Sequence, residues 1–217
     1  YTAEFFCANM TVEMDNTDKL KVLHQDACNM GLEFEPPNIN RGQYRFEPVS
    51  DSVIRYGLGA IKGTGESAIA AIVAEREANG PYSSLFDFCA RVDRGRLNKR
   101  TVEALIKAGA FDSLHLDRAT LLASIDLAFD YALVQEAHAN QGGLFDLMDD
   151  GHGSSTQEPE LVAVTPWDIR ERLQQEKTAL GFHLSGHLFD ANAQEVRRFV
   201  PTPLGNLHDS REIQWLA

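Results

Sequence analysis

The sequence lacks long apolar runs and paired cysteines, and these absences exclude several common classes of protein. No uninterrupted apolar run approaches the roughly 20 residues that a transmembrane helix needs. Cys7, Cys28 and Cys89 form no Cys-x-x-Cys pair, so their spacing favours neither a zinc site nor a disulfide framework. We therefore predict a cytoplasmic protein that works away from membranes. Because the chain begins with Tyr inside a predicted helix, we expect it to be a piece of a longer protein.

Positive charge is also scarce. The 217 residues include 32 acidic side chains and 20 Lys and Arg, which gives a formal charge of −12 and argues against a protein coated in nucleic acid. Basic side chains nevertheless crowd one stretch, opposed there only by Asp93: Arg91, Arg94, Arg96, Lys99 and Arg100. A local basic surface predicts limited contact with phosphates, although such a run is also typical of a solvated loop.

Catalytic signatures are missing as well. The carboxylate pairs at 15–18 and 149–150 fall at a predicted helix cap and in a predicted linker, where they could not hold divalent ions rigidly. His183 and His187 are four residues apart, but flanking glycines interrupt the helix and no third ligand is evident. We therefore predict no catalytic residue, no metal ligand and no cofactor in this chain.

The most informative stretch is 57–79, which reads GLGAIKGTGESAIAAIVAEREAN. Its second half has the apolar spacing of a buried helix face. Before that helix comes the loop Lys62, Gly63, Thr64, Gly65. Glycines permit a tight loop with outward N–H groups beside a helix N-terminus, which is a site for anions. We predict that this helix-hairpin-helix pattern binds nucleic-acid phosphates; the alternative is a tight turn alone. It is neither a Walker loop nor a dinucleotide-binding fingerprint.

Periodicity predicts a mainly α fold with a small β hairpin that pairs 44–46 with 53–56. Helices over 84–92 and 98–108 flank a basic turn and suggest a second, degenerate helix-hairpin-helix, which makes the motif a tandem. Asp117 is predicted to cap the longest helix. A polar segment, 140–165, is predicted to be a flexible linker. The remaining predicted helices cover 2–13, a segment ending at Gly31, 166–180, and a short segment from Asp190.

A small motif lies in the predicted linker: Gln141, Gly142, Gly143, Leu144 and Phe145. An apolar pair in a flexible segment often marks partner docking. Gln followed by such a pair has the shape of a peptide that binds a sliding clamp. The alternative is that Leu144 and Phe145 pack back onto the long helix.

Several blocks of the chain, taken together, resemble the α subunits of bacterial DNA polymerase III, the C-family replicative polymerases. In chain order the blocks are 1–5 (YTAEF), 13–17 (EMDNT), 36–40 (PPNIN), 56–65 (YGLGAIKGTG), 85–91 (LFDFCAR), 97–100 (LNKR) with 109–112 (GAFD), and 181–187 (GFHLSGH). Two departures stand out. Leu188 occupies a position where the family often has Pro, and glycines at 142–143 replace bulkier residues.

The resemblance implies four parts. Residues 1–56 are similar to the distal fingers, and 57–139 to a tandem helix-hairpin-helix DNA-binding domain with a long helix. Residues 140–165 correspond to a flexible linker with a clamp-binding peptide, and 166–217 to a helical segment leading to a truncated OB domain. The catalytic aspartates of the family lie outside this chain. The resemblance thus implies a non-catalytic fragment of a DNA-directed DNA polymerase whose parent uses Mg²⁺.

The expected partners are duplex DNA, a sliding clamp, other replicase subunits and no membrane, in a bacterial cytoplasm. Alternatives are the error-prone paralogue of the family and a helix-hairpin-helix module that binds protein. The predicted DNA-binding residues are Lys62, Gly63, Thr64, Gly65, Arg94, Arg96, Lys99 and Arg100. The predicted clamp-binding residues are Gln141, Leu144 and Phe145.

Overall fold

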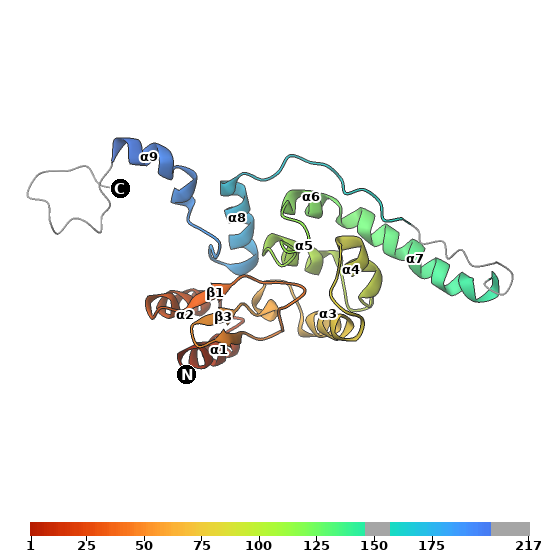
Figure 1. The fold of residues 1–217 in the computed structure, drawn as a ribbon, viewed down its shortest axis with the longest axis horizontal. Helices are drawn as coiled ribbons and strands as arrows, with labels where there is room; N and C mark the ends of the chain where they lie inside the picture. Colours follow the sequence, from red (N-terminus) through yellow and green to blue (C-terminus); the bar gives the residue numbers. More distant parts are fainter. Residues whose placement is uncertain (146–156, 201–217) are drawn as a thin grey trace, which may run out of the picture.

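The computed structural model describes residues 1–145 and 157–200, and it confirms the mainly α fold with a small sheet (Figure 1). The sheet and the first two helices lie together, followed by the hairpin helices. In the view of Figure 1, α7 extends to the right and α9 to the upper left. The elements are α1 (Thr2–Val12), α2 (Thr17–Asn29), β1 (Glu33–Glu35), β2 (Glu47–Ser50), β3 (Val53–Arg55), the 3₁₀ turn η1 (Leu58–Ala60), α3 (Glu66–Asn79), α4 (Leu85–Arg91), α5 (Lys99–Lys107), α6 (Arg118–Ala123), α7 (Ile125–Phe145), α8 (Ile169–Leu180), the 3₁₀ turn η2 (Leu188–Ala191) and α9 (Ala193–Phe199).

The sheet has the strand order β1-β3-β2, with β1 parallel and β2 antiparallel to β3. The predicted hairpin exists, but its first strand is Glu47–Ser50 rather than 44–46. Phe46 is buried in the core instead. Pro48 is accommodated because β2 is an edge strand with an irregular register between Pro48 and Ser50.

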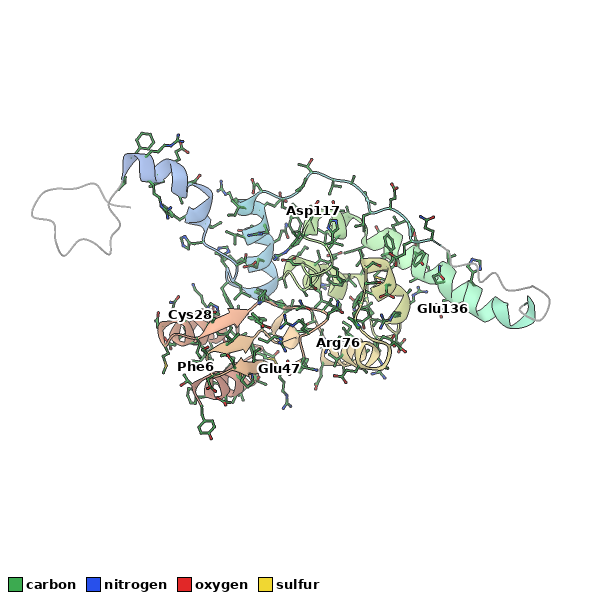
Figure 2. The ribbon with its side chains drawn as sticks, in the orientation of Figure 1. Phe6, Cys28, Glu47, Arg76, Asp117 and Glu136 are labelled. Carbon is green, nitrogen blue, oxygen red and sulfur yellow. The ribbon has the colours of Figure 1, made fainter. Side chains whose placement is uncertain are left out.

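The hairpin helices pack around aromatic side chains. The Phe88 ring lies 4.9 Å from the Tyr82 ring and 5.0 Å from the Phe111 ring, both edge-on. Arg76, on α3, is labelled in Figure 2 and is 9% exposed. Its Nη1 donates to the carbonyls of Ile39 (3.0 Å) and Gly42 (2.8 Å). These bonds tie α3 to the chain between β1 and β2 and fix the helix that starts at the glycine loop.

The single long helix predicted from Asp117 is wrong, because two helices meet at Ser124. Asp117 caps the short α6, and its Oδ1 accepts the N–H of Ala119 at 3.0 Å. Ser124 is buried; its Oγ donates to the Thr120 carbonyl (2.8 Å) and accepts the N–H of Val162 (2.9 Å). A serine hydroxyl that bonds to the carbonyl four residues earlier weakens and often bends a helix, which agrees with the break at this position.

Helix α7 continues to Phe145, so 140–145 are helical where a linker was predicted. Residues 157–168 have no regular secondary structure, as the linker prediction expected for 157–165. The next helix begins at Ile169, later than predicted, because the Asp168 side chain accepts the N–H of Glu171 (2.7 Å) and caps it. In the described ranges 1–145 and 157–200, no helix is both long and apolar enough to cross a membrane.

Candidate nucleic-acid interface

The first hairpin loop is fixed by its own hydrogen bonds. Gly63 has φ +89°, which a residue with a side chain rarely adopts. The Thr64 hydroxyl donates to the carbonyl of Ile61 (2.7 Å), and the Thr64 N–H also donates to that carbonyl, at 3.2 Å. Both donors of Thr64 are therefore used inside the loop. In this geometry Thr64 holds the loop in shape rather than offering a donor to a ligand.

The start of α3 leaves backbone donors open. Gly65 is the N-cap residue and provides no side-chain cap. The N–H groups of Ala68 and Ile69 both donate to the Gly65 carbonyl at 3.1 Å. Within the described part of the chain, the N–H groups of Glu66 and Ser67 donate no hydrogen bond. Open donors at a helix N-terminus suit an anion, although the Glu66 carboxylate opposes it.

A pocket of about 380 Å³ lies beside this loop. Three of its side chains are cationic, and a single carboxylate, Glu103, lies among them, with Oε2 3.8 Å from Lys107 Nζ. The cations make the pocket suitable for a phosphate. The lining residues are Lys62, Gly63, Arg100, Glu103, Ala104, Lys107, Thr178 and Ala179.

The pocket brings together three of the eight residues predicted to bind DNA: Lys62, Gly63 and Arg100. Lys107 was missed. It lies seven residues after Arg100 in the same helix, so helical spacing on 98–108 could have found it.

The turn of the second hairpin differs, because the cations at this turn contact carboxylates. Arg94 Nη1 lies 3.0 Å from Glu136 Oε2, and Glu136 is labelled on α7 in Figure 2. Arg96 Nε lies 3.6 Å from Asp93 Oδ2. Lys99 bonds to Asp126 at the start of α7, and this hydrogen bond raises the pKa of the Lys99 ammonium. Arg94, Arg96 and Lys99 are thus ion-paired within the protein. The sequence alone does not show that α7 returns to this turn.

Arg91, at the start of the basic run, is structural. Its guanidinium lies 4.7 Å from the centre of the Tyr82 ring and forms ion pairs with Glu75 (3.1 Å) and Asp87 (3.0 Å). Nη2 also donates to the Gly80 carbonyl at 2.7 Å. These contacts join the end of α3 to α4.

A buried guanidinium connects the hairpins to α8. Arg118 donates to both carboxylate oxygens of Asp112, at 2.8 and 2.6 Å, and to the Lys107 carbonyl at 3.1 Å. Its Nη1 lies 3.5 Å from Glu176 Oε2, and the two side chains are 4% and 1% exposed. Burial acts to lower the pKa of Arg118, but the hydrogen bond to Asp112 and the neighbouring carboxylate charges raise it overall.

The other candidate sites from the sequence are the clamp-binding motif and the histidine pair. Gln141, Leu144 and Phe145 belong to the last turns of α7, and their side chains lie outside the described residues. His183 Nδ1 lies 3.0 Å from the Leu173 carbonyl. No group of three or more His, Cys, Asp or Glu side chains is placed to hold a metal ion within 1–145 and 157–200.

The sequence of this chain is similar to those of known proteins. The helix-hairpin-helix motif family matches residues 31–121, which include both hairpins. Over 207 residues, 95% of this chain, the sequence is 51% identical to the DNA polymerase III subunit alpha of Neisseria meningitidis serogroup B. The chain belongs to the DNA polymerase III subunit alpha family.

Two further DNA polymerase III alpha subunits extend this match. That of Vibrio cholerae is 41% identical over 222 residues and covers 100% of the chain. That of Escherichia coli K12 is 41% identical over 205 residues and covers 92% of the chain. The chain spans 18%, 19% and 17% of the length of these three relatives and so corresponds to one segment of DNA polymerase III subunit alpha.

Proposed function

We propose that this chain is a duplex-DNA-binding segment of a replicative DNA polymerase. The observation that carries the proposal is the convergence of Lys62, Arg100 and Lys107 on the Gly63 loop. Together with the open N–H groups of α3, these cations would hold backbone phosphates. Contacts of this kind carry no base information, so binding is expected to be independent of sequence.

The activity of the complete polymerase is part of the same proposal. The parent would extend primers from deoxynucleoside triphosphates with Mg²⁺, together with other replicase subunits in the bacterial cytoplasm. Family membership supports this activity for the parent. The segment itself is assigned no catalytic step, since its task is to keep the enzyme on DNA.

Anisotropy of a labelled primer-template duplex, titrated with the 217-residue chain, tests DNA binding. The variant is Lys62→Ala with Arg100→Ala. The control removes two exposed cations elsewhere, Lys21→Ala on α2 and Arg197→Ala on α9. We expect the pocket variant to lose about a hundredfold in affinity and the slope of log K against log salt to shrink by about 2. Equal effects in the two variants would refute the pocket as the phosphate site.

A second proposed contact is with a sliding clamp, through Gln141, Leu144 and Phe145. The structure has these residues in a helix, whereas a docked peptide would be extended. Gly142 and Gly143 make the end of α7 easy to unwind, because each glycine costs a helix about 1 kcal/mol relative to alanine. The sequence therefore favours release of this segment for binding. The two contacts together would raise processivity through effective concentration.

Calorimetric titration of the chain with purified clamp tests this contact. We expect Leu144→Ala with Phe145→Ala to abolish the binding. The control is Leu133→Ala with Val134→Ala, which removes two apolar side chains that are 48% and 46% exposed earlier on α7. Clamp binding that survives the first variant would rule out the peptide as the contact. A wild-type chain that does not bind the clamp would favour the error-prone paralogue.

A further inference from the structure

Helix α8 forms one wall of the phosphate pocket, although it comes far later in the sequence. Thr178 and Ala179, in its last turn, line the pocket opposite α5. The helix-hairpin-helix match ends at residue 121, so α8 lies outside that motif. The pocket is therefore not a property of the two hairpins alone.

The last turn of α8 holds Lys62 directly. The N–H of Lys62 donates to the Ala179 carbonyl at 2.8 Å. Helix α8 ends at Gly181 (φ +89°), where an added Cβ would lie 3.1 Å from Lys62 Nζ. The ammonium thus lies at the negative end of the α8 dipole, which favours a cation there. Both the backbone and the charge of Lys62 are placed by this helix end.

A buried carboxylate fixes α8 in this position. Glu176 Oε1 accepts the N–H groups of Ser185 (2.7 Å) and Leu184, so it holds the chain that follows the helix. Its other oxygen faces Arg118, which in turn holds Asp112 and the end of α5. Because a buried carboxylate without its partner is costly, the Arg118 and Glu176 pair stabilises the observed position of α8 against α5.

We propose that the last turn of α8 is an integral part of the DNA site, in which Thr178 borders the bound strand and Glu176 positions Lys62. The inference rests on the proposed DNA binding at the pocket. Since the end of α8 carries negative partial charge, α8 supplies position, and the attraction comes from Lys62, Arg100 and Lys107. Glu176 acts through the helix end and is a positioning residue.

The first test introduces a negative charge on α8 where it lines the pocket. Thr178 is exposed and its Oγ1 donates within α8 to the Gln174 carbonyl, so Thr178→Glu leaves the packed face unchanged. We expect it to weaken duplex binding by the 217-residue chain about tenfold at low salt. Gln25→Glu on exposed α2 makes the same change of net charge and should weaken binding less than twofold. Equal effects of the two substitutions would overturn the inference.

The second test separates positioning from general stability by a double-mutant cycle. The variants are Glu176→Gln, Lys62→Ala and their combination, with binding measured below the melting temperature of each. If Glu176 positions Lys62, removal of Lys62 should cost about tenfold in the wild type and less than threefold beside Glu176→Gln. Additive losses would show that Glu176 only stabilises the fold.

The two proposals fail in different ways. A loss of affinity in Lys62→Ala with Arg100→Ala, but not in Thr178→Glu beyond its control, would leave the DNA site standing and remove α8 from it. Absence of duplex binding by the wild-type chain would overturn both. Circular dichroism of each variant confirms that the helices are retained.

Discussion

The sequence predicts two hairpins, the second of them degenerate, and the structure shows how their turns differ. At the first turn, Lys62 faces a pocket that Arg100 and Lys107 also line from α5 of the second hairpin, and the single carboxylate of that pocket is Glu103. At the second, Arg94 and Lys99 are paired with carboxylates on α7. The glycines differ as well, since Gly63 has a positive φ and the second turn contains no such residue. A tandem motif therefore does not imply two equal phosphate sites.

The helices that follow the tandem create this asymmetry. Helix α7 packs along α4, with the Tyr131 ring 5.6 Å from the Phe86 ring, and thereby brings its acids to the second turn. Helix α8 packs on α5 and completes the pocket at the first turn. Helix α7 thus supplies carboxylates that pair with cations at the second turn, whereas α8 lines the pocket at the first turn.

The largest expected effect comes from comparing removal of the pocket cations with removal of the cations at the second turn. Lys62→Gln with Arg100→Gln should weaken duplex binding about a hundredfold, since a hydrogen bond to a charged group contributes about 1.5–3 kcal/mol. Arg94→Gln with Arg96→Gln should weaken it only about threefold, because these cations already have partners. Anisotropy titrations at one salt concentration measure both. The asymmetry would be disproved by similar losses in the two variants.

Replacing Gly63 and Gly95, the glycines of the two turns, by alanine should give the next largest effect, on stability and on duplex affinity. Gly63→Ala should destabilise the chain by about 1–2 kcal/mol, because φ +89° strains a residue with a side chain. The added Cβ itself has room, since its nearest neighbour would be Ala104 Cβ at 3.9 Å. Gly95→Ala would approach Asp93 Oδ1 at 3.2 Å and should cost less than about 1 kcal/mol.

Urea unfolding of the two alanine variants measures the difference in stability. Duplex affinity should fall about tenfold only for Gly63→Ala, whose loop carries the site. A Gly95→Ala variant that is the less stable of the two would show that the backbone geometry of the loops does not explain the asymmetry.

Much of the fold around the two turns was predictable from local sequence chemistry. The caps at Ser84 and Asn98 and the left-handed Gly63 follow from rules that act within a few residues. For the same reason the sequence identified the loop and the pocket cation next to it. Asp117 was recognised as a cap. The break at Ser124 was missed, where the hydroxyl bonds both to nearby Thr120 and to distant Val162.

The ion pairing of the basic run depends on long-range packing. Nothing near Arg94 in the sequence shows that Glu136, 42 residues later, will lie 3.0 Å away. Nor does the pattern of 166–180 indicate that Ala179 accepts a hydrogen bond from Lys62. Charge counts along a sequence predict where cations are, while tertiary contacts decide which remain open to a ligand.

Removing the α7 acids should reverse part of the asymmetry. Asp126→Asn with Glu136→Gln frees Lys99 and Arg94, so we expect duplex affinity to rise about two- to fivefold at low salt, and the gain to disappear in 0.5 M salt. The control, Glu4→Gln with Asp26→Asn, removes two exposed acids from α1 and α2. If the control strengthens binding equally, net charge rather than the ion pairs is responsible.

The smallest expected effect is a pH response confined to the first hairpin. The His24 ring lies 4.4 Å from the Phe34 ring and 5.1 Å from that of Phe182, just after α8. Burial lowers the pKa of His24 below its ordinary 6.5. As pH falls through 6.5 the unfolded state binds the proton more readily, so stability present at pH 7.5 is lost toward pH 5.5.

Hydrogen-exchange protection factors measured at both pH values can locate this loss. Protection of the Lys62 amide, which donates to Ala179 at the end of α8, should fall at pH 5.5. That of Leu97, bonded at 3.0 Å within the second turn, should stay constant. His24→Phe should remove the difference, because phenylalanine fills the same aromatic contact without titrating, whereas His138→Gln on exposed α7 should retain it. Equal loss at both amides would mean that α8 supports the two hairpins alike.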